Sequence, residues 1–373
     1  MKRNYSIKNQ SVSGVQKPQK TGRHPKSHTS RKNQLHATMN TQSQDTKTGF
    51  AWNKTNLNSA NQWATALCAG AKNRLFYGGN DGTNNNFYGR SLDNKSWDLI
   101  AGPFNETINS MCSTSQGDVY FVGPKASNGR FALFCCYGVT QELALIPGSG
   151  QAYSIDHVCV DGIGNLYMTG KFVGPNGYPV VMQYNIQKTS WEVLGDTSTP
   201  VFPSALAGMC ADSSGNVYVI GVDASGAAYL QIWNGTAWGD PITSSLLDIN
   251  SLDISCDNNG NVYTVNSTSL VSYNTSTKQF NPNPAPFPSD MMAAYVDCID
   301  NVVYIAGYTD AYTSFVLALN TPATGWNTVT PTEWTANTIV NSINDYSSQN
   351  NHMVNVLIGS NGAIWDGSSI HTS

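Results

Sequence analysis

A short stretch of the chain recurs along its length at nearly even spacing. Its clearest copy is Gly215-Asn216-Val217-Tyr218-Val219-Ile220-Gly221, where Gly and Asn supply turn chemistry and the β-branched and aromatic residues favour a strand. The aromatic position of the copies recurs every 41 to 52 residues, at Phe76, Tyr120, Tyr167, Tyr218, Tyr263, Tyr304 and, as a degenerate seventh copy, Val356. Three residues later each copy has Gly or Asn, where the backbone can turn. A repeat of this length predicts one continuous body rather than several independent domains.

Each copy predicts a unit of four antiparallel strands. A strand such as 207–210 precedes the aromatic strand, a third strand ends in an aromatic or aliphatic residue followed by Asn or Asp, and a fourth opens near a large aromatic such as Trp238. A sheet of this size is too small to be stable alone, but radial stacking covers both of its faces. We therefore predict an all-β fold, a seven-bladed β-propeller of four-stranded antiparallel blades. The expected blades span about residues 62–106, 107–150, 151–200, 201–245, 246–288, 289–335, and 336–373 together with 48–57.

The two ends of the repeat array predict how the ring closes. The seventh copy ends at 363–367 without a fourth strand of its own, and an orphan strand at 49–53 precedes the first copy. We expect residues 49–56 to complete the last blade beside residues 362–368. This pairing removes two exposed strand edges that would otherwise promote aggregation.

The connector between the first two strands of a unit has the form Asp-x-x-Gly-Asn in three copies. It begins at Asp161, Asp212 and Asp257. The Asp side chain can accept hydrogen bonds from turn amides while Gly takes a positive φ. A calcium loop needs further acids at alternate positions and a late Glu, which these connectors lack. The connectors are therefore expected to be turns and not metal loops.

Charge divides the chain into a basic tail and an acidic body. Of its 20 Lys and Arg, ten lie in residues 1–50, which contain one acid, Asp45; the remaining residues hold ten bases against 23 of the 24 acids. Residues 1–47 have few large apolar residues, so we expect them to be a disordered basic tail, with the propeller occupying 48–373. An acidic body argues against a nucleic-acid-binding propeller, which leaves the tail alone for that role.

The sequence also bears on location and on cysteine chemistry. No apolar run follows Met1-Lys2-Arg3, and no later segment has the ~20 apolar residues of a membrane helix, so we expect a cytoplasmic protein or one delivered by a non-Sec route. Cys68, Cys112, Cys159 and Cys210 each stand eight residues before the aromatic of their copy. Equivalent positions in successive repeats are usually too far apart for a disulfide, so the cysteines are expected to be reduced, small, buried residues. The neighbours Cys135 and Cys136 cannot both face the same core.

The unit resembles a known class of repeat. The strand Gly215-Asn216-Val-Tyr218-Val-Ile-Gly221 and the hairpin Trp233-Asn234-Gly235-Thr-Ala-Trp238 are similar to the kelch or galactose-oxidase-type β-propeller repeats over residues 49–373. The kelch double Gly occurs only at Gly78-Gly79. The resemblance implies the fold but not one function, since members include scaffolds, lectins, enzymes and host-interaction proteins.

The sequence lacks the sets of residues that form well-known catalytic and metal sites. A copper site of the galactose-oxidase kind needs paired His and Tyr with a cross-linking Cys, but the body has only His157, His352 and His371, in dissimilar contexts. A sialidase-like site needs three converging Arg, and the three Arg of the body, Arg74, Arg90 and Arg130, all fall within the first two blades. The usual hydrolase, zinc and phosphate-loop motifs are absent from the sequence. We therefore expect no enzyme activity, cofactor or metal.

The loops that do not repeat are the best candidates for function. Loops between second and third strands, together with those that join blades, gather on one face of a propeller, and variation between repeats maps to such binding faces. The candidate binding residues on this face are Asp81, Lys125, Arg130, Lys171, Tyr178, Asp223, Tyr308 and Asp310. We expect a monomeric, non-enzymatic scaffold that binds a protein partner there, in the manner of a host-interaction protein. The alternatives are a carbohydrate-binding propeller, given the nine Trp and eighteen Tyr, and in third place a glycan-processing hydrolase.

Overall fold

The computed structural model describes the greater part of the repeat body. The described residues are 49–56, 63–70, 74–91, 96–114, 116–123, 130–138, 140–149, 152–172, 179–185, 187–195, 202, 206–248, 253–266, 269–282, 287, 291–299, 302–309, 314–320, 327–328, 340–348, 351–358 and 363–370. All of them lie in the compact unit Thr46–Ser373. The predicted tail, residues 1–47, lies outside the described residues.

The described residues form strands and turns. In chain order the strands are β1 (Gly49–Asn56), β2 (Trp63–Gly70), β3 (Arg74–Asn80), β4 (Asn85–Ser91), β5 (Asp98–Phe104), β6 (Met111–Ser113), β7 (Val119–Gly123), β8 (Ala132–Cys136), β9 (Leu143–Leu145), β10 (Ala152–Val160), β11 (Leu166–Phe172), β12 (Pro179–Asn185), β13 (Ser190–Val193), β14 (Leu206–Ala211), β15 (Val217–Val222), β16 (Ala228–Trp233), β17 (Ile242–Thr243), β18 (Asp253–Cys256), β19 (Asn261–Val265), β20 (Leu270–Asn274), β21 (Gln279–Pro282), β22 (Met291–Ile299), β23 (Val302–Thr309), β24 (Ser314–Asn320), β25 (Asn327–Thr328), β26 (Val340–Ser348), β27 (Asn351–Ile358) and β28 (Ala363–Ile370).

These strands form seven four-stranded sheets within the described residues, and neighbours in each sheet are antiparallel. In six sheets the strands lie in chain order, as in β14-β15-β16-β17. The seventh has the order β1-β28-β27-β26, with Gly49 opposite Ile370 and Asn56 opposite Ala363. In six sheets the repeated aromatic lies on the second strand, and Val356 of the seventh copy lies on β27, next to the end strand β26, so the predicted four-stranded antiparallel unit is confirmed.

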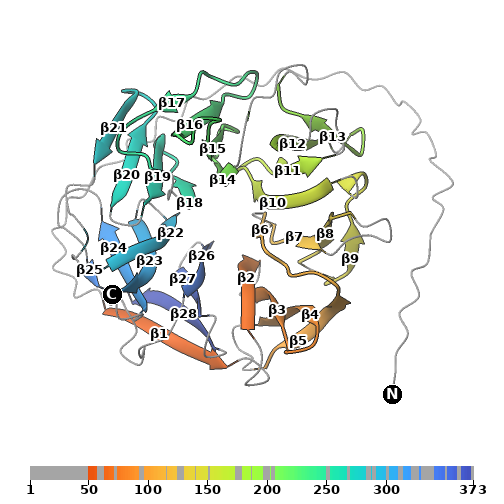
Figure 1. Cartoon of the computed structure of the whole chain (residues 1–373). Coiled ribbons are helices and arrows are strands. Elements are labelled where there is room, and N and C mark those ends of the chain that lie inside the picture. Colours follow the sequence, from red (N-terminus) through yellow and green to blue (C-terminus); the bar gives the residue numbers. More distant parts are fainter. Residues whose placement is uncertain are drawn as a thin grey trace, which may run out of the picture. The chain divides into compact units, whose positions relative to one another are not determined.

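One end strand of each sheet contacts an end strand of the next sheet. These contacts run in succession from β2 through β6, β10, β14, β18 and β22 to β26, and β26 in turn contacts β2. Figure 1 shows these strands on the inside of the arrangement and strands such as β5, β9, β13 and β21 on the outside. The inner strands therefore line the centre of this unit.

The Asp connectors are turns, as the sequence predicts. Asp212 Oδ1 accepts hydrogen bonds from the amides of Ser214 (2.8 Å) and Asn216 (3.0 Å), and Oδ2 accepts from Asn216 Nδ2 (2.7 Å) and the Tyr218 hydroxyl (2.8 Å). Gly215 takes a positive φ of 85°. Asp161 and Asp257 make the same four bonds in their own connectors. Each carboxylate is thus used by its turn and by the tyrosine of the next strand.

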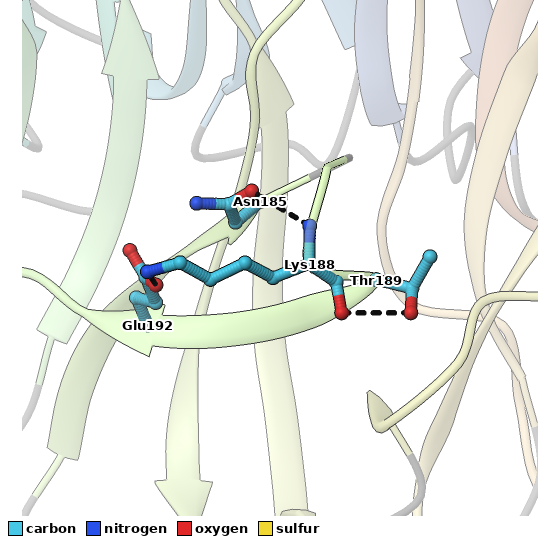
Figure 2. Close-up of polar contacts among 4 residues, drawn as sticks. All are labelled: Asn185, Lys188, Thr189 and Glu192. Atoms are coloured by element: carbon cyan, nitrogen blue, oxygen red, sulfur yellow. Dashed lines mark hydrogen bonds and ion pairs between the residues drawn. The ribbon is translucent and has the colours of Figure 1, made fainter.

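The Asn residues after the third strands have a similar role. Asn234 Oδ1 accepts from the amides of Thr236 (3.0 Å) and Ala237 (2.9 Å), which starts the turn toward the fourth strand. Figure 2 shows the equivalent turn at Asn185, whose Oδ1 accepts from the Lys188 amide at 3.0 Å. The Lys188 ammonium lies 2.5 Å from Glu192, but both side chains are exposed, so this ion pair contributes little to stability.

The hydrophobic core lies between the sheets. One cluster joins Tyr218, Ile220 and Leu230 of one sheet to Ile254 and Val262 of the next, and similar clusters fill the other described interfaces. Burying both faces of each sheet supplies the apolar area that a four-stranded sheet lacks alone.

Tryptophans and cysteines show the same two-sided packing. Trp97 and Trp233 are buried, and Trp238 Nε1 donates to the Leu194 carbonyl of the preceding sheet at 2.7 Å. Cys135 and Cys136 are both buried but belong to different clusters on opposite sides of β8. The prediction that these two cysteines do not face the same core is therefore confirmed.

Polar side chains link the inner strands of neighbouring sheets. Thr65 Oγ1 donates to the Ile108 carbonyl at 2.7 Å, and Ser110 Oγ accepts from the Val158 amide at 3.0 Å. Asp253 Oδ2 accepts from the Val296 amide at 3.0 Å, which joins β18 to β22. Burial raises the pKa of Asp253 to about 7, although its two backbone hydrogen bonds oppose this shift.

Removing one turn carboxylate tests its contribution to stability. We expect Asp212→Ala to lower the free energy of unfolding by about 2–4 kcal/mol, because the half-buried Asn216 and the buried Tyr218 donors lose their acceptor. Asp223→Ala is the matched control: Asp223 also accepts from turn amides, at Ser225 and Ala227, but its turn is exposed. In urea unfolding, the control variant should lose clearly less stability than Asp212→Ala. Equal losses in the two variants would contradict the stated role of the buried turn.

The raised pKa of Asp253 predicts a pH dependence of stability. Since the folded state holds the proton up to about pH 7 and the unfolded state releases it near ~4, the free energy of unfolding should fall as pH rises between these values and then level off. Asp253→Asn removes the titrating group. Urea unfolding of both proteins from pH 5 to 8.5 should show the variant gaining stability relative to the wild type as the pH increases. Parallel curves would contradict the assignment.

Candidate functional site

Asp81 and Asp223, two candidate residues of the predicted binding face, lie in turns with similar local geometry. Asp81, between β3 and β4, accepts from the amides of Thr83 (2.9 Å) and Asn84 (2.7 Å), and these backbone hydrogen bonds lower the pKa of its carboxyl. Asp223, between β15 and β16, accepts from Ser225 Oγ (2.6 Å) and two turn amides, and these hydrogen bonds lower its pKa. Both stay ionised at neutral pH, and both carboxylates shape their own turn.

Arg130 lies in a different setting, at a junction between two sheets. The Phe131 amide donates to the Ala152 carbonyl at 3.0 Å, which joins the start of β8 to the start of β10. The guanidinium carbon of Arg130 lies 4.0 Å from the centre of the Tyr153 ring. Tyr153 is 55% exposed, one of the most exposed large apolar side chains among the described residues. The half-buried Arg130 side chain and the exposed Tyr153 ring therefore form a cation–π pair next to this backbone bridge.

The remaining candidates are less fully described. Lys171 lies in β11 and Tyr308 in β23, where the structure gives the course of the backbone. Lys125, Tyr178 and Asp310 lie outside the described residues. Of the eight candidates, the described contacts tie Arg130 alone to a neighbour across a sheet boundary.

Tyr153 was missed in the sequence analysis. The predicted binding face included the loops that join repeats, but its candidate residues came from loops inside each repeat, whereas Tyr153 follows the connection between two repeats. The available signal was its position next to Ala152, a buried residue at the start of an inner strand. Strand alternation directs the residue after a buried one outward.

The inner strands line a cavity of about 430 Å³ at the centre of the unit. Its wall includes Ser110, His157, Cys210, Asp253, Cys256 and Asp297. No Lys or Arg is among the lining residues that the structure describes. Five of the cysteines, Cys112, Cys159, Cys210, Cys256 and Cys298, line this cavity, and each of them also packs against a hydrophobic cluster between the sheets.

The polar groups of the cavity are used largely in structural contacts. Ser255 Oγ lies 3.2 Å from Asp297 Oδ1 and also accepts from the Cys298 amide at 3.1 Å. Burial lowers the pKa of His157, so this imidazole is neutral at pH 7. Within the described ranges, no group of three or more His, Cys, Asp or Glu side chains is arranged to hold a metal ion. Nor does that part of the chain contain a helix long and apolar enough to cross a membrane.

Comparisons with known proteins identify the fold. No family model and no curated protein sequence matches the chain. Among solved structures it is similar to a streptogramin B lyase (TM-score 0.65, 11% identity, 86% of this chain and 98% of that one). It is also similar to YCF48 bound to a D1 peptide (TM-score 0.60, 13% identity, 86% and 97%) and to virginiamycin B lyase from Staphylococcus aureus (TM-score 0.61, 12% identity, 86% and 100%).

At this level of identity the similarity shows the fold alone. The neighbours are β-propellers, so the chain is a propeller-type repeat protein with four-stranded antiparallel sheets. They include lyases and a protein solved with a bound peptide, so the shared fold assigns no activity to this chain.

Proposed function

We propose that the protein is a non-enzymatic interaction module that binds a protein partner through the loop edge around Arg130 and Tyr153. The cation–π pair of Arg130 with the exposed Tyr153 ring carries this proposal. Arg and Tyr are enriched among the residues that contribute most to protein interfaces. The backbone bridge between Phe131 and Ala152 fixes both side chains before binding, which reduces the entropy lost on association.

The charges of the loops around Arg130 and Tyr153 indicate which charge the partner should have. Lys125 belongs to the same repeat as Arg130 and Lys171 to the same repeat as Tyr153, whereas Asp223 and Asp310 belong to later repeats. A partner segment with acidic residues is therefore the best match for the Arg130 side of the edge. YCF48, a neighbour in fold, is solved with a bound peptide, which gives a precedent for a propeller that holds one.

The alternatives have weaker support. Carbohydrate binding would use open aromatic faces, but Trp97 and Trp233 are buried, and Arg130 covers one face of Tyr153. A hydrolase would need a nucleophile activated by a base, while Ser110, Asp253 and Ser255 of the cavity accept hydrogen bonds from backbone amides.

We further infer that the seven sheets are the blades of one closed propeller that occupies residues 48–373, with residues 1–47 as a separate basic tail. The inner-strand contacts that return from β26 to β2 support the ring. The pairing of β1 with β28 supports a closure in which the first strand completes the last sheet. Within the propeller class, the Gly215–Gly221 strand and the Trp233–Trp238 hairpin favour a kelch-type repeat.

Two truncations test the closure. Deleting residues 1–56 removes β1 and leaves β28 as an exposed edge, so we expect the melting temperature to fall by about 10 °C or more. Deleting residues 1–45 keeps β1 and should leave the melting temperature within about 2 °C of the full chain. Calorimetric melting of the three proteins makes the comparison, and equal effects of the two deletions would refute the closure.

Two substitutions test the binding site. A partner is first identified by affinity purification with crosslinking and then produced pure for a direct binding measurement. We expect Arg130→Ala and Tyr153→Ala each to weaken this interaction by about 10-fold or more, as interface hot spots do. Tyr137→Ala is the matched control, because Tyr137 is 42% exposed but lies in the β8–β9 turn at the other end of its strand.

Two results would contradict the proposed function. One is undiminished binding of the partner by the Arg130→Ala/Tyr153→Ala double variant. The other is strong, saturable binding of the body to a glycan array, which would support the carbohydrate-binding alternative.

A further inference from the structure

The central cavity has the size of a site for a small molecule. Its volume of about 430 Å³ lies within the range of ligand pockets, and its wall is built from residues at the inner strands β2, β6, β10, β14, β18 and β22. Asn109, one of the lining residues, is exposed, so the wall reaches solvent at the start of β6. A ligand can therefore enter the cavity from that side.

Two acidic side chains lie on neighbouring inner strands of the cavity wall. Asp253 is on β18 and Asp297 on β22, and the hydrogen bond from the Val296 amide to Asp253 Oδ2 joins the two strands. A carboxylate has about four acceptor sites, and Asp253 uses two of them, for the amides of Val296 and Ile254. No Lys or Arg is among the described lining residues, so the wall attracts cations and repels anions.

The ionised form of Asp253 would be stabilised by a bound cation. Burial raises the pKa of this carboxyl group to about 7, which reflects the cost of holding a negative charge away from water. An opposite charge nearby favours the ionised form and offsets this cost. The described lining residues supply no basic side chain for that role, so a cationic ligand can take it.

His157 supplies a second polar group on the wall. Ser110, His157 and Asp253 occupy equivalent positions, two residues before the one that pairs with the repeated aromatic. Ser110 and Asp253 each accept an amide hydrogen bond from the next inner strand, whereas the His157 imidazole has no hydrogen-bond partner among the described residues. Protein encloses the ring almost completely, and its remaining accessible surface opens on the cavity. Burial lowers its pKa, so the neutral imidazole can accept a hydrogen bond from a ligand.

The remainder of the wall suits an aliphatic chain. Val160, Ala211 and the five lining cysteines are half-buried, and thiols behave as small apolar groups. A bare metal ion needs at least three ligand side chains, and no such set is assembled in the described part of the chain. A primary ammonium group is the better match, because it donates up to three hydrogen bonds to carboxylate and imidazole acceptors.

We propose that the central cavity binds a small aliphatic amine, whose ammonium group pairs with Asp253 and Asp297 and whose other end donates a hydrogen bond to His157. In the succession of inner strands β14 lies between β10 and β18, so the alkyl chain of the ligand passes this strand between its two polar ends. A straight-chain diamine has a donor at each end and an apolar middle, which fits this arrangement. The site is separate from the Arg130–Tyr153 edge, since neither of those residues lines the cavity.

Titration calorimetry of the full-length protein with the diamine putrescine tests the site. The measurement is made at pH 8, where the Asp253 carboxyl group is ionised. We expect saturable binding with a dissociation constant of about 1 mM or lower, which is within reach of a ligand of this size. Butanediol, the neutral diol with the same straight carbon chain, should bind at least about 10-fold more weakly, because it carries no charge for the carboxylates.

Substitutions separate the cavity from the general charge of the body. Asp253→Asn and Asp297→Asn should each weaken putrescine binding by about 10-fold or more, because one charged acceptor is lost. His157→Leu should weaken it by about 5-fold, since it removes a neutral acceptor and leaves both carboxylates in place. Asp223→Asn is the matched control, because it removes a carboxylate from an exposed turn outside the cavity lining and should bind putrescine as the wild type does.

Three results would overturn the proposal. The first is absence of putrescine binding to the wild type, and the second is equally strong binding of butanediol. The third is a loss in Asp223→Asn as large as in the two cavity variants, which would show that the net charge of the body attracts the amine. Circular dichroism melting establishes which variants fold, and His157→Leu keeps the test decisive if the Asp variants do not, because wild-type affinity in that folded variant would exclude the His157 contact.

Discussion

Packing of each small sheet between two neighbours is the interaction on which the rest of the structure depends. A four-stranded sheet of short strands has too little apolar surface to be stable alone, so Ile220 and Leu230 of one sheet pack with Ile254 and Val262 of the next. Close approach of inner strands then requires a residue without a side chain at Gly208. Polar bonds such as that from the Val296 amide to Asp253 satisfy groups at the narrow inner end of the same interface.

This constraint limits where function can lie. Residues on both faces of a sheet are committed to the core, as Cys135 and Cys136 on opposite sides of β8 illustrate. The positions left for function are the outer strand, the turns at the strand ends and the lining of the central cavity. Buried aromatic residues such as Tyr218 belong to the scaffold, so they give no information about a partner.

The sequence predicted the elements whose cause is local. The strand at 217–222 and its Asp212 turn follow from residues within a few positions of each other, and the regular spacing of Tyr218 and its equivalents predicted the four-stranded unit. It did not predict the Arg130–Tyr153 contact, because this contact depends on a bridge between two repeats. The cysteine positions were recognised as equivalent, but one-dimensional spacing does not say whether a strand position faces a sheet interface or the centre.

The same turn chemistry has different consequences at the two ends of a strand. Asp212 and Asp223 flank one strand, β15, and each accepts hydrogen bonds from the amides of its turn. Asp212 is buried and also accepts from the Tyr218 hydroxyl, which ties its turn to the core. Asp223 is more exposed, so its loop can change sequence at little cost to the fold. The turn at one end of the strand is therefore constrained by the scaffold. The turn at the other end can differ between successive repeats and form a binding surface.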